Sequence, residues 1–208
     1  MTKKDYYYIL NTRYHILHTE ILKYMNKITG GNALIDPKII IEKAGIIERM
    51  QVADLGCGST GHFIFPIANA IGERGIIYAV DILKNNLTNI ERRVRQDNLK
   101  QVKTVWSNLE IFKATKIETD SLDVGLLINV LYQSNKRSEM IRESFRMVKR
   151  GGKLVIVDWK KVSTPFGPSV EERVNRENLM AVCQRMGMEL LEEFNAGEYH
   201  FGLVFLKH

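Results

Sequence analysis

Residues 52–61 read Val-Ala-Asp-Leu-Gly-Cys-Gly-Ser-Thr-Gly, and they indicate the architecture more strongly than any other part of the chain. The apolar residues that open this stretch predict a short buried strand, and the segment after it, as far as Ile71, predicts a helix. Glycines between a strand and a helix can adopt positive φ, and they let a ligand approach the backbone because they carry no Cβ atom. The N–H groups that begin such a helix attract polar or anionic atoms. The stretch therefore predicts a strand–turn–helix unit with a ligand at the turn.

A carboxylate follows the next predicted strand at a spacing that suits this interpretation. Residues 76–80 predict the strand, and Asp81 comes directly after it, 20 positions beyond Gly61. An acid at the end of the second strand of such a unit can accept hydrogen bonds from both hydroxyls of a ribose. Together the two features predict a cofactor that contains adenosine, without distinguishing between cofactors of that kind.

Beyond Asp81, strands and helices continue to alternate. The predicted strands are 102–106, 123–130 and 153–157, and the predicted helices are 83–96 and 138–149. This alternation produces a parallel sheet with helices on both faces. After a helix at 175–186 the chain ends in two strands, 189–194 and 199–206, and the short connection between them can join only antiparallel neighbours. We expect an α/β fold with a Rossmann-like seven-stranded sheet, parallel except for a C-terminal antiparallel hairpin.

Composition places the chain among soluble globular proteins. Its 208 residues are 45% hydrophobic and 26% charged, and no apolar run is long enough to span a bilayer. Two cysteines provide neither a disulfide framework nor a zinc ligand set, and no secretory signal begins the chain, so we expect a cytoplasmic protein. The formal charge of +6 leaves an RNA partner open. The basic residues are scattered, however, and those at 142–150 alternate with acids as on a solvated helix face.

The N-terminal residues 1–33 predict a helical extension to a domain at 34–208. Apolar residues recur at helical spacing over residues 6–28, and Gly30-Gly31-Asn32 breaks the pattern before Asp36 caps a second helix. The tyrosines of the extension (Tyr6, Tyr7, Tyr8 and Tyr14) could cover a ligand pocket as a lid, or the helix could simply pack. His15 and His18 lack a supporting carboxylate cluster, so no metal site is predicted.

From about Asp36 to its C-terminus the chain resembles the class I S-adenosylmethionine (SAM) dependent methyltransferases. Residues 54–61 resemble the first motif of that family, residues 79–82 its ribose-binding motif, and residues 147–154 the glycine turn before its fifth strand. Within the family, the resemblance is strongest to the small-molecule enzymes of the ubiquinone/menaquinone-biosynthesis type. It implies SAM as the cofactor and S-adenosylhomocysteine (SAH) as its product.

The resemblance also assigns residues to the cofactor. Asn108 stands where the family usually has an Asp that contacts the adenine amino group, and residues 123–132 resemble the segment beneath the cofactor. The implied cofactor-binding residues are Asp54, Gly56, Cys57, Gly58, Gly61, Asp81, Ile82, Asn108, Leu109, Asn129 and Val130.

Methyl transfer from a sulfonium requires alignment of donor and acceptor and exclusion of water, and a catalytic base is optional. The candidates for such a base follow the fourth and fifth strands or lie in the last strand, and each also has a structural interpretation: Tyr132, Asp158, Lys160 and His200, with Tyr199 beside it. The loop 164–168 is rigid and carries Phe166 at its tip, so we expect it to line the acceptor site. Phe166→Ala should then reduce acceptor turnover and leave SAM affinity intact.

The acceptor that these patterns favour is a small apolar or amphipathic molecule. Residues 129–132 read Asn-Val-Leu-Tyr rather than the Asn-Pro-Pro-Tyr that marks amino-group methyltransferases of this fold. An RNA methyltransferase, an NAD-dependent oxidoreductase and a SAM-binding module without activity remain as alternatives, and a homodimer stays open. Asp54 and the C-terminal hairpin count against the oxidoreductase.

Overall fold

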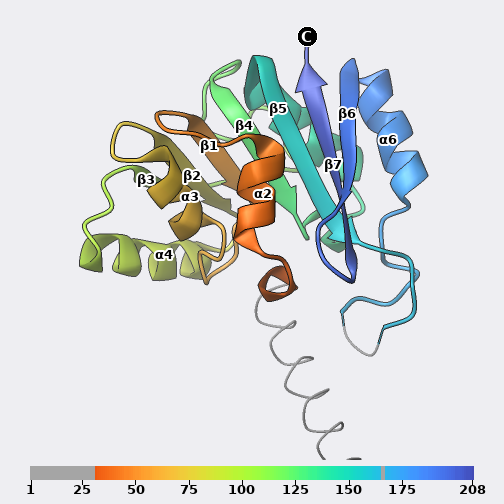
Figure 1. The fold of residues 1–208 in the computed structure, drawn as a ribbon, viewed down its shortest axis with the longest axis horizontal. Helices are drawn as coiled ribbons and strands as arrows, with labels where there is room; N and C mark the ends of the chain where they lie inside the picture. The colour runs from red at the N-terminus through yellow and green to blue at the C-terminus, as the bar shows by residue number, and fades with distance from the viewer. Residues whose placement is uncertain (1–30, 165–166) are drawn as a thin grey trace, which may run out of the picture.

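The computed structural model describes residues 31–164 and 167–208 (Figure 1). The predicted helix at 6–28, with its tyrosines and histidines, and Phe166 at the tip of its loop lie outside these residues. The predictions made for them, including the boundary between an extension and a domain, therefore stay predictions.

The described residues form the predicted sheet of seven strands. The strands are β1 (Gln51–Leu55), β2 (Ile76–Asp81), β3 (Val102–Trp106), β4 (Leu122–Ile128), β5 (Val148–Trp159), β6 (Met188–Asn195) and β7 (His200–Lys207). Their order across the sheet is β3-β2-β1-β4-β5-β7-β6. The first five strands pair in parallel, whereas β7 is antiparallel to both β5 and β6 (Figure 1). The α/β class, the parallel sheet and the C-terminal hairpin are thus confirmed.

Helices cover both faces of the sheet. On one face lie α2 (Pro37–Ala44), α3 (Ile64–Ile71) and α4 (Lys84–Gln96), and on the other lie α5 (Arg137–Met147) and α6 (Arg176–Arg185). Two short 3-10 helices, η1 (Asn32–Leu34) and η2 (Leu131–Gln133), flank the carboxyl end of β4. The strand β4 contributes side chains to the apolar cores on both faces, which explains its nearly continuous apolar sequence.

Two helix caps follow the sequence closely and one does not. Asp36 accepts a hydrogen bond from the Lys38 N–H at 2.9 Å, and Asn175 accepts one from the Asn178 N–H at 2.7 Å. Ser138, which as the first residue of the predicted helix 138–149 would be its cap, instead lies inside α5, whose N-cap position is taken by Lys136 without a side-chain hydrogen bond.

The junction between α5 and β5 also differs from the prediction. The helix ends at Met147, and β5 begins at once because Val148 pairs with Leu122 of β4. The predicted glycine turn at 151–152 is part of this strand. A Cβ atom on Gly152 would lie 2.9 Å from the carbonyl oxygen of Leu122, so the close approach of β4 requires glycine there.

Candidate active site

A cavity of about 510 Å³ opens at the carboxyl ends of the parallel strands, beside residues 56–61, the glycine loop that follows β1. This is the edge at which open α/β sheets bind ligands. Eight predicted cofactor residues line it, namely Gly56, Gly58, Asp81, Ile82, Asn108, Leu109, Asn129 and Val130. Asp54, Cys57 and Gly61 do not line it. The structure therefore brings together residues from four separate segments of the sequence.

The glycine loop owes its shape to close packing on both sides. Gly56 and Gly58 have φ values of +95° and +65°, which favour glycine. A Cβ atom on Gly56 would lie 2.5 Å from Val130, so residue 130 rests directly on the loop. A Cβ atom on Gly61 would lie 2.2 Å from the Phe65 ring. Gly56 thus allows the segment after β4 to approach the loop, whereas Gly61 allows α3 to pack.

Asp81 is held in place by the backbone around it. One carboxylate oxygen accepts a hydrogen bond from the Gly58 N–H at 2.9 Å, and the other accepts one from the Leu83 N–H at 2.8 Å. The residue is 7% exposed and lines the cavity. A carboxylate oxygen has more than one lone-pair site, so Asp81 can still accept hydrogen bonds from a ribose.

Asp54 lies in β1, just before the glycine loop, and does not line the cavity. It is buried, and its Oδ2 atom has no partner among the described residues. Burial, and secondarily the negative charge of Asp81, raises the pKa of Asp54 to about 7.

The wall formed by residues 107–110 is tied to the segment after η2. The Asn108 side chain accepts a hydrogen bond from the Glu110 N–H at 2.9 Å, and Ser134 Oγ donates to the Glu110 carboxylate at 2.6 Å. Glu110 and Ser134 both line the cavity, and neither was assigned to it from the sequence. No local pattern links residues 24 positions apart, so only the fold brings this pair together.

A second contact that the sequence did not indicate lies at the carboxyl end of β4, between Asn129, which was assigned to the cofactor, and Asn32, which was not. Asn129, with φ +55°, donates a hydrogen bond from its Nδ2 atom to Asn32 Oδ1 at 3.0 Å, and both residues line the cavity. In the sequence, Asn32 could be interpreted only as part of a helix break, because nothing in its neighbours indicates a partner so far along the chain.

Of the four candidate catalytic residues, only Tyr132 lines this cavity. Burial, followed by the negative charges of Asp158 and Glu172, raises the pKa of Tyr132 to about 12, so the phenol keeps its proton. The Asp158 carboxylate is buried and accepts hydrogen bonds from the Trp159 N–H at 2.8 Å and the Tyr132 N–H at 3.3 Å. Burial raises the pKa of Asp158 to about 7. Asp158 therefore holds the backbone of Tyr132 in place through this hydrogen bond.

His200 and Lys160 lie away from the cavity. The His200 ring is buried against Trp159, with 4.3 Å between ring centroids. Burial, together with the charges of Lys160 and Arg173, lowers the pKa of His200 to about 3, so the imidazole is neutral. The Lys160 ammonium donates to the carbonyl oxygens of Gly197 and Glu198, at 3.1 and 2.9 Å, and so holds the β6–β7 turn.

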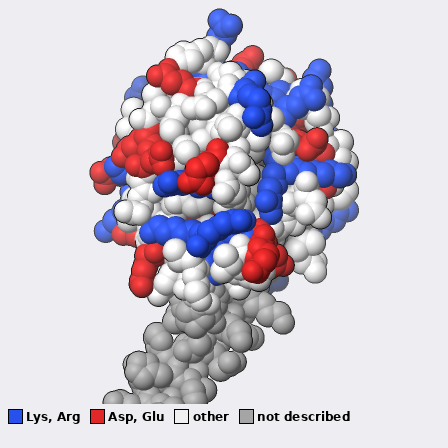
Figure 2. All heavy atoms as spheres, turned by 90° about the vertical axis from the view of Figure 1, so that its right-hand side faces the viewer, with Lys and Arg blue, Asp and Glu red and all other residues white. Residues whose placement is uncertain are grey.

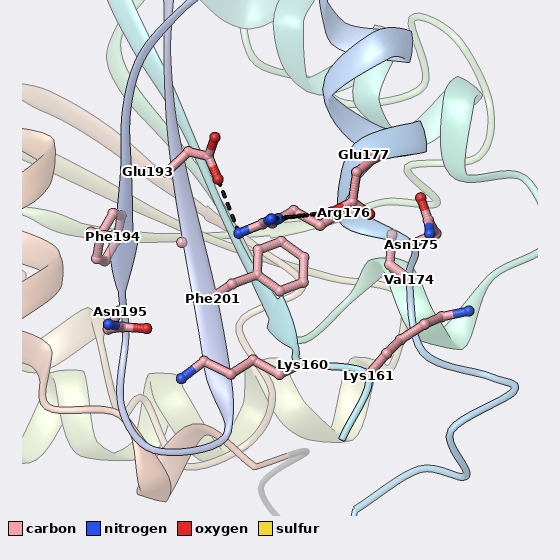
Figure 3. Close-up of a pocket in the computed structure, with 11 residues that line it drawn as sticks. Lys160, Lys161, Val174, Asn175, Arg176, Glu177, Glu193, Phe194, Asn195 and Phe201 are labelled. Carbon is pink, nitrogen blue, oxygen red and sulfur yellow. Dashed lines mark hydrogen bonds and ion pairs between the residues drawn. The ribbon is translucent and has the colours of Figure 1, made fainter. Parts of the chain in front are cut away.

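Lys160 belongs to a second pocket, of about 430 Å³, between the start of α6 and the β6–β7 hairpin (Figure 3). The Phe201 ring lies at its centre in this view, and Arg176 extends beside it toward Glu193. Arg176 forms ion pairs of 3.1 Å with both Glu177 and Glu193. The charge of Arg176 is therefore neutralised within the pocket.

Residues 31–164 and 167–208 hold no group of three or more His, Cys, Asp or Glu side chains arranged to bind a metal ion. Within the same residues, no helix has the length and apolar character needed to cross a bilayer.

Comparison with known proteins agrees with this geometry. Residues 46–196 match the methyltransferase domain family. The chain is 22% identical to a demethylmenaquinone methyltransferase of Lactococcus lactis over 154 residues, which are 74% of this chain and 59% of that protein. It is 27% identical to the ubiquinone/menaquinone biosynthesis C-methyltransferase UbiE of Vibrio campbellii over 151 residues, 70% of this chain and 56% of the relative. The chain thus spans somewhat more than half the length of these curated relatives.

Among solved structures, a SAM-dependent methyltransferase from Aquifex aeolicus has the same fold. The TM-score is 0.77 at 22% identity, and the match covers 91% of this chain and 98% of the other. The fold and the family define the class, that of the class I SAM-dependent methyltransferases, whose cofactor is SAM and whose cofactor product is SAH. The chain belongs to the methyltransferase domain family, and the resemblance stated from its motifs is confirmed.

Proposed function

We propose that this protein transfers the methyl group of SAM to a small, apolar or amphipathic acceptor. The observation that carries the proposal is the cavity in which Asp81, the glycine loop and the segment after β4 meet. Bound SAM would supply an electrophilic methyl group on a sulfonium, which needs no further activation. The protein then has to bind the methyl donor and the acceptor, orient them toward each other and exclude water.

Each part of the cavity suits one part of that cofactor. Asp81 would hold the ribose and Asn108 with Leu109 the adenine. Gly56 and Gly58, which carry no Cβ atom, would leave room beside the loop for the remainder of the molecule. The carboxylate of Asp81 is already oriented by two N–H groups, so its binding geometry is formed before the ligand arrives.

A small acceptor fits the remaining wall and the surface of the protein. Apolar side chains line the cavity beside the polar groups, among them Ile128, Val130 and Met140. On the face shown in Figure 2, Lys and Arg side chains are interspersed with Asp and Glu rather than gathered in a basic area that could follow a nucleic acid. The relatives are named for quinone biosynthesis, which makes a reduced quinone ring the first acceptor to test.

Calorimetric titration with SAM, SAH and NAD tests the cofactor. We expect SAM and SAH to bind and NAD not to bind. Asp81→Asn should weaken SAH binding about 10- to 100-fold, because the amide loses the charge-assisted hydrogen bonds to the ribose. Asp97→Asn, which alters an exposed acid at the end of α4, is the matched control and should leave SAH affinity unchanged.

Two results would contradict the proposal. The first is a wild-type protein that binds neither SAM nor SAH, and the second is an Asp81→Asn variant that keeps full affinity. Thermal unfolding of each variant separates a lost contact from a lost fold. Transfer of a labelled methyl group from SAM to reduced demethylmenaquinone then tests the acceptor.

A further inference from the structure

Among the described residues, one side chain that lines the cavity has a buried polar atom without a hydrogen-bond partner. Asn129 is 2% exposed, and its Oδ1 atom makes no hydrogen bond within the described part of the chain. Its other polar groups are all engaged. The backbone N–H donates to the Val157 carbonyl at 2.9 Å, the backbone carbonyl accepts from Gln133 Nε2 at 2.7 Å, and Nδ2 donates to Asn32. A buried acceptor left unsatisfied is costly, so a donor from the occupant of the cavity is the expected partner.

The amide of Asn129 cannot easily turn to find a partner elsewhere. Asn32 holds its Nδ2 atom, and Asn32 is itself fixed by its neighbours in the chain. A Cβ atom on Gly31 would lie 2.4 Å from the Trp159 ring, so the backbone there rests directly on the indole. Ile35, on the other side of η1, is buried in the core. The pair therefore holds Oδ1 of Asn129 as a hydrogen-bond acceptor with a fixed orientation.

The pair joins a residue of the methyltransferase domain to one that lies outside it. Asn129 precedes Val130, which rests on Gly56, so the amide lies beside the glycine loop. Asn32 lies outside residues 46–196, the part of the chain that matches the methyltransferase domain family. Methyltransferases that share this domain share the cofactor and differ in the methyl acceptor. A contact that depends on a residue outside the domain is therefore better suited to the methyl acceptor than to the cofactor.

We propose that Asn129, positioned by Asn32, binds the methyl acceptor by accepting a hydrogen bond from its hydroxyl group. This rests on the proposed function. The acceptor is then a neutral molecule with an O–H group beside the atom that receives the methyl group, as in a phenol or a reduced quinone. A neutral amide can orient such a hydroxyl without taking its proton.

The proposed methyl transfer needs no catalytic base from Asn129 or Asn32. An electron pair of the acceptor ring carbon next to the hydroxyl forms the new bond to the methyl carbon. The bond between methyl carbon and sulfur breaks, and the sulfur keeps its electron pair as a thioether. The ring carbon then releases its proton to water, and the hydroxyl regains its initial state. Asn129 is thus an acceptor-binding residue, and Asn32 is a positioning residue.

The test compares two probes that differ only in their donors, 1,4-dihydroxynaphthalene and 1,4-dimethoxynaphthalene. Each is titrated without oxygen into the protein saturated with SAH. Asn129→Gly removes the amide, and glycine tolerates φ +55°. We expect this variant to bind the diol about tenfold more weakly. The resemblance implies a cofactor contact for Asn129, whereas this inference assigns its side chain to the methyl acceptor. The affinity of the variant for SAH should then stay within about twofold of the wild type, and its affinity for the dimethyl ether should be unchanged.

Variants of Asn32 test the positioning role. Asn32→Ala should lower the affinity for the diol alone, about threefold, because the Asn129 amide loses the hydrogen bond that orients it. Asn32→Asp still offers an oxygen to Nδ2 of Asn129 and should retain the affinity. Asn135→Ala, an exposed amide just after η2, is the matched control and should bind both probes as the wild type does.

Three results would overturn the inference. These are an Asn129→Gly variant that loses SAH and diol affinity together, one that loses both naphthalenes equally, and a wild-type complex with SAH that does not bind the diol. If the wild type fails to bind SAH at all, the proposed function fails first and this inference with it.

Discussion

Glu143 and Arg146 illustrate what a single side chain does inside this fold. The Glu143 carboxylate accepts hydrogen bonds from the Lys113 N–H at 2.7 Å and the Thr115 N–H at 3.0 Å, and it pairs with Arg146 at 2.9 Å. Arg146 also donates to the Ile117 carbonyl oxygen at 3.0 Å. Burial alone would raise the pKa of Glu143, but these hydrogen bonds outweigh it and leave that pKa below its ordinary value. The pair fastens the loop before β4 to α5.

Replacing this glutamate should therefore destabilise the protein. Glu143→Gln leaves the buried Arg146 without its counter-charge, and we expect a loss of about 3 kcal/mol in the free energy of unfolding, measured by urea denaturation. Glu139→Gln, an exposed acid on the same helix, should change that free energy by less than about 0.5 kcal/mol. Equal effects of the two substitutions would show that the buried pair contributes nothing particular.

At the scale of elements, the connection from β5 to α6 depends on one arginine. The buried guanidinium of Arg173 donates to the carbonyl oxygens of Lys160, Val162 and Pro168, and to Thr164 Oγ1, at distances of 2.5 to 3.0 Å. One planar group with several donors can hold several carbonyls at once, whereas an ammonium cannot match that geometry. The predicted acceptor loop is thus tied down near both of its ends.

Arg173→Lys should loosen this connection while leaving the sheet intact. We expect faster amide hydrogen exchange over residues 160–164 and unchanged exchange in β1 and β4, since the hydrogen bonds described for the arginine go to the connection itself. Arg176→Lys, at an exposed ion pair of α6, is the control and should leave the exchange of the loop unchanged. Exchange rates in the Arg173→Lys loop equal to those of the wild type would show that other contacts hold the connection.

At the scale of the whole molecule, buried titratable groups make stability depend on pH in two opposing ways. Asp54 and Asp158 keep protons in the folded state up to a pKa of about 7, whereas the unfolded chain releases them near its ordinary pKa of 3.8. Their contribution to stability is therefore lost as the pH rises from about 4 to 7. His200 has its pKa lowered to about 3, so it favours the folded state increasingly as the pH rises from about 3 to 6.5.

Asp54→Asn separates one of these contributions from the others. At position 54 the variant carries no group that must stay protonated, while Asp158 is unchanged, so its stability relative to the wild type should rise by roughly 3–4 kcal/mol between pH 4 and pH 7.5. Urea denaturation at several pH values measures this difference. Glu48→Gln, an exposed acid, is the control. A difference between Asp54→Asn and the wild type that does not change with pH would mean that Asp54 is ionised in the folded protein.

The sequence by itself determined the order of strands and helices, the direction of the last two strands, the glycine loop and the place of Asp81. These follow from apolar periodicity, from the length of connections and from residue types that suit one local backbone, all of which act between near neighbours in the chain. Eight of the cofactor residues implied by the resemblance lie together in one cavity, because each lies at or just after the carboxyl end of a parallel strand.

Only the tertiary structure decided which side chains meet across the chain. The pairing of Asn129 with Asn32 joins residues 97 positions apart, and the charges predicted to face solvent on α5 include the buried pair of Glu143 and Arg146. It likewise placed His200 against Trp159 rather than in the cavity. Such contacts depend on how whole layers pack, and no local pattern records them, because a polar residue reads the same in a sequence whether a distant partner buries it or water surrounds it.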